Sequence, residues 1–456
     1  LKGKYSINEI NDEYDYIDFN IKEYGAFFRE CDINNDLETR SNDEILKIAR
    51  LNNSGLLISL TDACNLRCKY CVYSESYGLT KNKSQKFLSL ENAIKGVEKY
   101  FEFIEKILET NPRKTFTISF YGGEPLLNYK VMFSVIEYVN NKYPGKFVYN
   151  VTTNGILLSP YVCEKLVEYK VNVFVSLDGP QDQHDRLRVD EKGKGSYERI
   201  IEKLLYLKEK YPQYYQEFVS VVSVYDLKTD LFKVQRFFDQ CYELKLLPPT
   251  KIINQVIDTD TTYYEQFTSE DYEHCYEQYS EIKGNYFENI SKKETVLPFT
   301  RSLIGMNYLS IALRKRYMDV PPERMYTGNS CFPGTKIFLD TNGDFGICER
   351  VNGSHPIGNI YEGIDANKIR ELIESYSKMV LIYCRKCPVS RLCGNCFRTF
   401  EKEGSFEFSQ EICQRSKKFI ESNLQEFIKL GTINPKFSIM AHTRKEAYFI
   451  DEYANV

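Results

Sequence analysis

The sequence predicts an α/β fold, a partial and open barrel of six strand–helix units followed by a cysteine-rich domain with a small β-hairpin and helices. Three observations carry this prediction. Short apolar runs alternate with amphipathic stretches from about residue 55 to residue 260, the alternation then stops, and seven of the fourteen cysteines lie within 331–413. Regular alternation gives a parallel sheet with right-handed crossovers. Six units are two fewer than a full eight-stranded barrel needs.

The expected strands are six short runs rich in β-branched or aromatic residues. They are Leu56–Thr61, Phe116–Tyr121, Phe147–Thr152, Asn172–Leu177, Phe218–Val224 and Lys251–Val256. The expected helices have apolar residues at helical spacing: Asn42–Leu51, Glu91–Glu109, Tyr129–Lys142, Pro160–Tyr169, Tyr197–Lys210, Leu231–Leu244 and Gln414–Leu430. A hairpin is expected over Lys336–Cys348, because Asp340-Thr-Asn-Gly343 is a strong turn signal.

At 456 residues the chain is too long for one ordinary core, so several domains are expected. We place an N-terminal extension over 1–52, the barrel over 53–260 and a helical bridge over 261–324. The cysteine-rich domain then covers 325–430, and a tail covers 431–456.

The composition excludes several classes of protein. A net charge of −4 leaves no excess of positive charge for a sequence-independent grip on nucleic acid. No apolar run is long enough to span a membrane and no signal peptide opens the chain. We therefore expect a cytoplasmic protein with reduced thiols, in which clustered cysteines are typical of metal or iron–sulfur ligands.

The first cysteine cluster follows the first expected strand and has the spacing C-x3-C-x2-C, formed by Cys64, Cys68 and Cys71. Three thiolates from a tight loop suit a four-iron–four-sulfur (4Fe–4S) cluster and leave one iron open to bind a small molecule. The alternative is a zinc knuckle, which normally needs a fourth Cys or His nearby. No cysteine or histidine occurs between Cys71 and Cys163.

This motif, with Tyr70 before the last cysteine, resembles the signature of the radical S-adenosylmethionine (SAM) superfamily. The resemblance implies that Cys64, Cys68 and Cys71 are the catalytic cluster ligands. It also implies that the open iron binds SAM, which is cleaved to methionine and a 5′-deoxyadenosyl radical. Radical chemistry of this kind belongs to the cofactor, and the protein supplies placement and exclusion of water.

Further motifs follow the second, third and fourth strands, at the end where barrel active sites form. Tyr121-Gly-Gly-Glu-Pro, Thr152-Thr-Asn-Gly155 and Ser176-Leu-Asp-Gly179 are followed by His184-Asp-Arg-Leu-Arg188. The last two motifs resemble the peptide-modifying branch of the superfamily. By that resemblance the SAM-binding residues are Tyr70, Gly122, Gly123, Glu124, Thr153, Asn154, Ser176, Asp178 and Arg188. The glycine turn would meet the SAM amino group, Ser176 and Arg188 its carboxylate, and Asp178 would lie near the ribose. Taken singly, each of these residues is equally well explained as a solvated turn residue.

The second cysteine region resembles the SPASM extension, which carries two auxiliary 4Fe–4S clusters. The resemblance assigns Cys384, Cys387, Cys393 and Cys413 to auxiliary cluster II and Cys331, Cys348 and Cys396 to auxiliary cluster I. The spacing departs from the family at Cys396, which two residues rather than three separate from Cys393. A zinc ribbon is the alternative, because two C-x2-C pairs also suit zinc. His355 is the histidine closest to these ligands, a candidate polar neighbour of a cluster.

Two closed auxiliary clusters need eight thiolates and the segment supplies seven. We therefore hypothesise that auxiliary cluster I has an open iron that takes a substrate thiolate. The combination resembles thioether-forming maturases of sactipeptides and ranthipeptides. It implies three clusters, SAM, a ribosomally made Cys-containing precursor peptide and an external electron donor such as flavodoxin or ferredoxin. In such maturases an N-terminal module binds the leader peptide as an added strand. Residues 1–52 are either a remnant of that module or an ordinary extension.

Other functions stay open at this point. Among oxidoreductases of the same family, the alternatives are formylglycine formation on a sulfatase and carbon–carbon crosslinking of a peptide. A different class is a zinc-stabilised peptide-binding module without catalysis.

Overall fold

The computed structural model describes residues 41–78, 84–111, 113–312, 331–351, 353–384, 387–390, 392–402 and 404–434. The predictions for 1–40, for the end of the helical bridge and for the tail beyond residue 434 lie outside these ranges. Among the described helices, none has the length and the apolar character that crossing a membrane requires.

Six parallel strands form the barrel sheet in chain order. They are β1 (Gly55–Thr61), β2 (Phe116–Gly122), β3 (Phe147–Thr153), β4 (Asn172–Ser176), β5 (Val219–Tyr225) and β6 (Thr250–Gln255). Every predicted strand is present, and its ends differ from the prediction by at most one residue. The predicted fold class, an open six-stranded α/β barrel with a cysteine-rich region after it, is therefore confirmed.

The helices that connect these strands have the predicted amphipathic character. They are α3 (Leu90–Thr110), α4 (Tyr129–Lys142), α5 (Pro160–Glu168), α7 (Tyr197–Lys210) and α9 (Leu231–Glu243). On α3, buried side chains recur at steps of three and four, from Ala93 through Val97 and Tyr100 to Ile104. The Ser89 side chain caps its first turn by accepting a backbone hydrogen bond. The barrel also contains short elements that we did not predict: η1 (Pro125–Asn128), α6 (Gln181–Leu187) and α8 (Pro212–Phe218). The short helix η2 (Tyr263–Gln266) lies at the start of the predicted helical bridge.

The remaining described elements precede the barrel or follow it. They are α2 (Asn42–Leu51), α10 (Ser269–Lys292), α11 (Pro298–Thr300), η3 (Arg301–Gly305), α12 (Met306–Ala312), β7 (Lys336–Leu339), β8 (Asp344–Gly346), β9 (Gly358–Asn359), β10 (Gly363–Ile364), α13 (Ala366–Cys384), α14 (Phe397–Phe400), β11 (Glu401–Lys402), β12 (Ser405–Phe406) and α15 (Gln410–Ile433). The predicted helix over 414–430 is the longer α15, whereas α13, which has 19 residues, was not predicted at all.

The predicted hairpin forms, but it does not stand apart from the barrel. Strand β7 pairs in parallel with β1, with Gly55 opposite Lys336 and Ile58 opposite Leu339. Strands β8, β9 and β10 continue the same sheet with antiparallel pairing, so one sheet of ten strands joins both regions. The cysteine-rich region is thus built onto the open edge of the barrel. This junction follows from burial, because every side chain of β1 and of β7 is buried.

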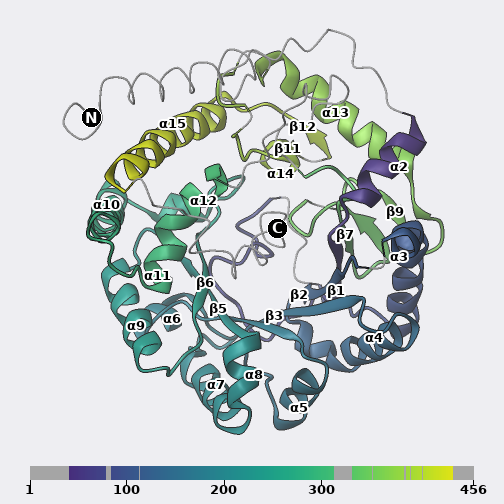
Figure 1. Ribbon diagram of the computed structural model, residues 1–456, viewed down its shortest axis with the longest axis horizontal. Helices are drawn as coiled ribbons and strands as arrows, with labels where there is room; N and C mark the ends of the chain where they lie inside the picture. Colours follow the sequence, from purple (N-terminus) through teal and green to yellow (C-terminus); the bar gives the residue numbers. More distant parts are fainter. Residues whose placement is uncertain are drawn as a thin grey trace.

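The molecule has the outline of a ring in the view of Figure 1. The barrel strands line one half of the ring with their helices outside, while α13 and α15 lie across the opposite half. Glu426 on α15 joins the two halves, because it accepts hydrogen bonds from Lys283 of α10 (2.6 Å) and Tyr308 of α12 (2.8 Å). These two hydrogen bonds connect α15 to the helices that follow the barrel.

Candidate active site

The three cysteines of the first cluster lie on the loop that leaves the C-terminal end of β1. The thiols of Cys64, Cys68 and Cys71 are close enough that charge on the first or the last raises the pKa of the middle one. The backbone amides of Arg67 and Lys69 hold the loop in place at the C-terminal end of α6, where they donate to the carbonyls of Val189 (2.6 Å) and Leu187 (2.9 Å). The loop thus presents three neighbouring thiols from one end of the barrel, as predicted.

Burial raises the pKa of Cys68 to about 12, although the nearby charge of Arg188 acts in the opposite direction. A thiolate is therefore costly at this position unless a metal supplies positive charge, and coordination to a metal deprotonates a thiol outright. Within the residues that the structure describes, no three Cys, His, Asp or Glu side chains converge to hold a single ion. The thiolates of a four-iron cluster bind separate irons and do not need to converge on one point.

The glycine turn after β2 packs directly against this loop. Backbone amides of Gly123 and Glu124 donate to the carbonyls of Thr61 (2.7 Å) and Ala63 (2.8 Å). A Cβ atom on Gly123 would lie 2.1 Å from the Ala63 oxygen, and one on Gly122 would lie 2.2 Å from the Thr61 oxygen. Gly122 also has φ +137, which other residues rarely adopt. These two positions therefore require glycine because two backbones meet there.

The Glu124 carboxylate organises the turn from inside. It accepts hydrogen bonds from the Thr153 hydroxyl (2.6 Å) and from the backbone amides of Asn154 (2.8 Å) and Leu126 (3.1 Å). Burial raises the pKa of Glu124, and these hydrogen bonds partly oppose that rise. The Asn154 side chain in turn donates to Asn65 of the cysteine loop at 2.7 Å. The motifs after β2 and β3 thus form one network with the first cysteine loop.

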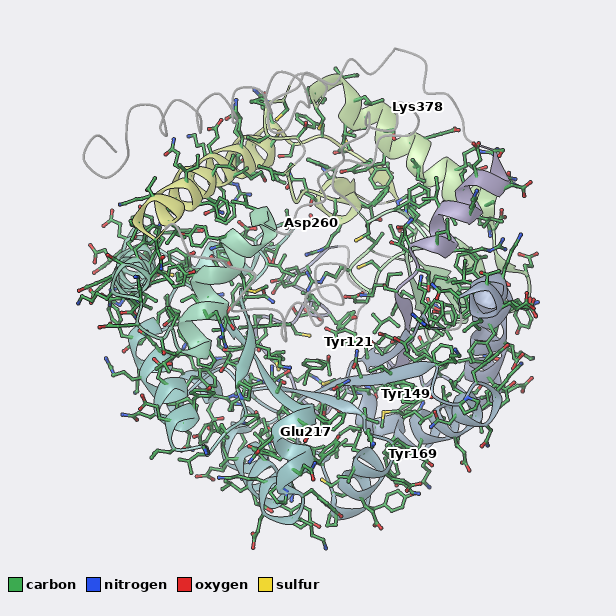
Figure 2. The ribbon with its side chains drawn as sticks, viewed as in Figure 1. Tyr121, Tyr149, Tyr169, Glu217, Asp260 and Lys378 are labelled. Atoms are coloured by element: carbon green, nitrogen blue, oxygen red, sulfur yellow. The ribbon has the colours of Figure 1, made fainter. Side chains whose placement is uncertain are left out.

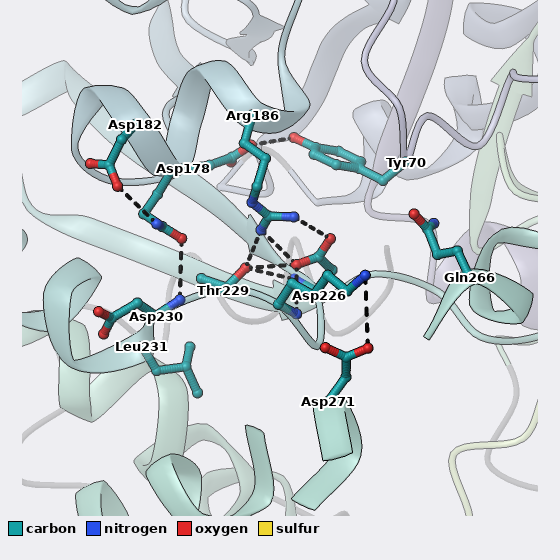
Figure 3. A network of polar contacts seen from close by, with 12 residues as sticks. Tyr70, Asp178, Asp182, Arg186, Asp226, Thr229, Asp230, Leu231, Gln266 and Asp271 are labelled. Carbon is teal, nitrogen blue, oxygen red and sulfur yellow. Dashed lines mark hydrogen bonds and ion pairs between the residues drawn. The ribbon is translucent and has the colours of Figure 1, made fainter. Parts of the chain in front are cut away.

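A second network connects that loop to the motif after β4. The Tyr70 hydroxyl donates to Asp178 at 2.6 Å and accepts from the Arg188 guanidinium at 2.7 Å. The other carboxylate oxygen of Asp178 accepts the Val224 amide at 2.9 Å. Figure 3 shows Tyr70 pointing at Asp178 from the cysteine loop. The side chains of Tyr70, Asp178 and Arg188 are all buried, while Ser176 at the end of β4 is half-buried.

A partly buried ion pair next to this network was not predicted. Arg186 binds both oxygens of Asp226, at 2.7 Å and 2.9 Å, and also the Thr229 hydroxyl at 3.0 Å (Figure 3). The Tyr263 hydroxyl donates to the same carboxylate at 2.9 Å. Burial alone would raise the pKa of Asp226, but Arg186 and the hydrogen bonds from Tyr263 and Thr229 together outweigh burial and the pKa is lowered. Arg186 belongs to a motif that the sequence singles out, whereas nothing local marks its partner 40 residues later.

The cysteines assigned to auxiliary cluster I come together from three segments. A charge on Cys396 raises the pKa of Cys331, and charges on Cys348 and Cys396 both raise the pKa of Arg350. Burial raises the pKa of Cys348 to about 12. These three thiols, far apart in the sequence, therefore share one environment.

A charged pair borders this second thiol group. Glu349 accepts a hydrogen bond from Lys336 at 2.9 Å and from the Cys348 thiol at 3.4 Å. Burial alone would raise the pKa of Glu349, but Lys336 and then Arg350 lower it to about 2. The Glu349 carboxylate is thus ionised and paired with Lys336 and Arg350.

The third thiol group lies beside the second. Charges on Cys413 and Cys387 raise the pKa of Cys393, and so does a charge on Cys396 of the neighbouring group. Cys384 ends α13, and its carbonyl accepts the Cys387 amide at 3.1 Å in the turn that follows. The structure thus brings together Cys387, Cys393 and Cys413 and places Cys384 one turn away.

One thiol in each predicted cluster site accepts a backbone hydrogen bond from the residue two positions further on. The N···S distance is 3.4 Å for Cys64 and 3.3 Å for Cys348, and Cys393 has the same kind of donor. Hydrogen bonds to the sulfurs are one of the means by which proteins adjust iron–sulfur clusters. The donor set therefore fits three iron–sulfur sites.

Two tyrosines lie between the first and second thiol groups. Burial raises the pKa of Tyr73 and brings that of Tyr121 to about 12, and both tyrosines are within reach of charge on Cys71 and on Cys348. Figure 2 shows Tyr121 toward the centre of the ring, in contrast to Lys378 on its outer rim. The two thiol groups therefore face the same interior.

Comparison with known proteins agrees with this arrangement. Residues 58–225, which contain the first cysteine loop and the motifs after β2, β3 and β4, match the Radical SAM superfamily. Residues 58–225 are a radical SAM domain. The predicted relationship of this part of the chain is thereby confirmed.

Several curated proteins resemble the chain over longer stretches. The radical SAM cyclopropyl synthase TigE of Paramaledivibacter caminithermalis is 31% identical over 239 residues, which is 49% of each protein, so the match spans about half the length of that relative. The cysteine-type anaerobic sulfatase-maturating enzyme of Clostridium perfringens strain 13 is 26% identical over 400 residues, 82% of this chain and 97% of the relative. The serine-type anaerobic sulfatase-maturating enzyme of Bacteroides thetaiotaomicron is 26% identical over 308 residues, which are 65% of this chain and 70% of the relative.

A solved structure has the same fold. The structure of anSMEcpe with bound AdoMet covers 83% of this chain and 99% of its own, with a TM-score of 0.60 and 22% identity. The match extends beyond the radical SAM domain into the cysteine-rich region. The likeness at this identity concerns the fold alone.

Outside the radical SAM domain, His355 has neighbours that the sequence did not indicate. Its ring stacks on Phe406, with 4.9 Å between the ring centroids, and its Nε2 lies 3.6 Å from Oε1 of Glu401. A role beside a cluster stays a prediction for His355. The same holds for the ligand and SAM-binding roles of the other predicted residues.

Proposed function

We propose that the chain is a radical SAM peptide maturase that joins a cysteine sulfur of a ribosomally made precursor to a carbon of the same peptide. The product is a thioether, and the peptide loses two hydrogens for each crosslink. When bound, the clusters and SAM supply abstraction of a hydrogen atom and an acceptor for the second electron of this oxidation.

The observation that carries the proposal is that two groups of three thiols face one interior. Cys64, Cys68 and Cys71 would hold the SAM-binding cluster, and Cys331, Cys348 and Cys396 would hold auxiliary cluster I. Each group is one thiolate short of a closed cluster. We infer that SAM completes the first ligand set and that the peptide's cysteine completes the second.

Arginines beside the second group favour an incoming anion. Arg398 lies next to Arg350 and close to Cys348 and Cys396, and burial lowers its pKa. Positive charge near a thiol lowers the pKa of that thiol and so favours the thiolate. We expect Arg350 and Arg398 to bring the peptide sulfur to the site in its reactive form.

On the barrel side of the site, Arg188 would hold SAM in place. Arg188 is buried beside Cys68 and tied to Tyr70, so its position is set before any ligand arrives. Its planar guanidinium suits a carboxylate such as that of SAM. Tyr73 and Tyr121 would fill the space between the two groups and keep water away from the reacting carbon.

The test is anaerobic reconstitution with iron and sulfide, followed by incubation with SAM, a reductant and a Cys-containing precursor peptide. We expect release of 5′-deoxyadenosine that rises when the peptide is added and falls back when its cysteines are replaced by serine. Release that is indifferent to the peptide's cysteines would contradict a role for the substrate thiol.

A second candidate is formation of formylglycine, because the chain resembles anaerobic sulfatase-maturating enzymes over 82% of its length. The two reactions differ in the fate of sulfur. A thioether keeps the cysteine sulfur in the peptide, whereas oxidation of cysteine to formylglycine removes it. Analysis of sulfur in the product therefore separates them.

A further inference from the structure

A chain of hydrogen bonds passes through His184, a residue to which neither the motifs nor the proposed function assign a role. The Asp178 amide donates to Nδ1 of His184 at 3.2 Å. Its Nε2 lies 2.8 Å from the Ser196 hydroxyl, which donates to the Arg188 carbonyl at 3.0 Å. The His184 and Ser196 side chains are fully buried.

The direction of every hydrogen bond in this chain follows from chemistry. An amide can only donate, so Nδ1 of His184 accepts and carries no proton. The single hydroxyl proton of Ser196 goes to the Arg188 carbonyl, so Ser196 accepts from Nε2–H. Burial and the charge of Arg188 hold the pKa of His184 well below its usual range. The imidazole is therefore the neutral Nε2–H tautomer.

The chain connects the two residues that the Tyr70 hydroxyl already connects through their side chains. Tyr70 donates to the Asp178 carboxylate and accepts from the Arg188 guanidinium. His184 and Ser196 connect the backbones of the same two residues. Asp178 and Arg188 are thus fixed relative to each other at both backbone and side chain, with the guanidinium beside Cys68.

We propose that His184 is a positioning residue for SAM binding, acting together with Ser196. The neutral imidazole is a rigid spacer with an acceptor on one side and a donor on the other. It sets the distance between the strand end that carries Asp178 and the turn that carries Arg188. This inference rests on the proposed use of SAM at the site.

The first test uses Ser196→Ala, which removes one hydroxyl and opens the chain of hydrogen bonds. We expect the cluster-loaded protein to bind SAM about fivefold more weakly by equilibrium dialysis, because one buried hydrogen bond is worth about 1 kcal/mol. The change that SAM induces in the electron paramagnetic resonance spectrum of the reduced cluster should weaken in parallel.

Leu207→Ala is the matched control, because Leu207 is fully buried on α7 and lies about three turns beyond Ser196, which occupies the N-cap position of that helix. We expect it to lower the melting temperature while leaving the Kd for SAM within about twofold of the wild-type value. Equal SAM affinity in Ser196→Ala and wild type would overturn the inference. Loss of affinity in both variants in proportion to their melting temperatures would overturn it as well.

The second test reads the tautomer and does not depend on SAM. The chain has four histidines, so protein labelled with ¹⁵N-histidine gives few ring signals, and His184→Asn identifies the signal of His184. We expect a neutral Nε2–H ring, and a proton on Nδ1 would contradict the hydrogen-bond chain. A wild-type protein that shows this tautomer but binds no SAM would instead contradict both the proposed function and the positioning role.

Discussion

Backbone contact at Gly123 gives the most local prediction. An alanine there would place its Cβ 2.1 Å from the Ala63 carbonyl oxygen, so the turn after β2 and the cysteine loop have to separate. We expect Gly123→Ala to cost about 1–3 kcal/mol of stability, as overpacking does. Thermal unfolding of the protein measures this change.

Gly284→Ala is the control for Gly123→Ala. Gly284 lies inside α10 with nothing within 4 Å of the added Cβ, so alanine there is expected to stabilise the helix by about 0.5–1 kcal/mol. If both substitutions change stability alike, the close approach of the two backbones at Gly123 is wrong.

At the residue scale, the sequence could predict those residues that lie in short motifs with a recognisable chemistry. Cys64, Cys68 and Cys71 lie together on one loop, and Asp178 and Arg188 meet at Tyr70 as their strand-end positions suggested. The hydrogen bonds of His184 and Asp226 could not be predicted, because no local sequence pattern identifies the partner of either side chain.

At the scale of elements, the β7–β1 junction predicts that the barrel and the cysteine-rich region unfold together. Leu339 of β7 is fully buried and packs close to Gly96 of α3. We expect Leu339→Ala to destabilise the protein by about 2–5 kcal/mol, as other buried leucine truncations do, and to keep a single unfolding transition in urea.

Leu205→Ala is the matched control for Leu339→Ala, because Leu205 is exposed on α7 and the same truncation is expected to change stability by less than about 0.5 kcal/mol. Two separate transitions in Leu339→Ala would mean that the two regions fold independently.

Helix α9 carries a carboxyl group that should make stability depend on pH. Burial raises the pKa of Asp239 to about 6, and Glu243 one turn later adds to the rise. A raised folded-state pKa contributes stability at pH below about 4 that is lost as the pH rises through about 6. We expect Asp239→Asn to be more stable than wild type at pH 8 and to lose this advantage at pH 4, measured by urea unfolding. A constant difference between pH 4 and pH 8 would contradict the assignment.

The elements were predicted with uneven success for a physical reason. Strands β1 to β6 and their crossover helices follow from hydrophobic periodicity, which is a local property. The pairing of β7 with β1 joins residues about 280 positions apart and has no local signature. Helix α13 has apolar residues at helical spacing, including Ile369, Ile373 and Val380, which is the same kind of local signal.

At the scale of the whole molecule, three thiol groups predict the metal content. We expect about twelve irons and twelve sulfides per chain after anaerobic reconstitution, from three four-iron clusters. Joint replacement of Cys64, Cys68 and Cys71 by alanine should leave about eight irons and remove SAM cleavage. Joint replacement of Cys163, Cys241 and Cys275, which lie singly on α5, α9 and α10, should leave about twelve. Zinc in place of iron would contradict the iron–sulfur assignment.

The most direct test of thioether formation follows the peptide's sulfur. After reaction, the precursor is reduced to open any disulfide, treated with a thiol-alkylating reagent and weighed by mass spectrometry. The account predicts a product two hydrogens lighter per crosslink that keeps its sulfur and does not take up the reagent. A product that has lost sulfur, or one whose cysteines are still alkylated after turnover, would contradict it.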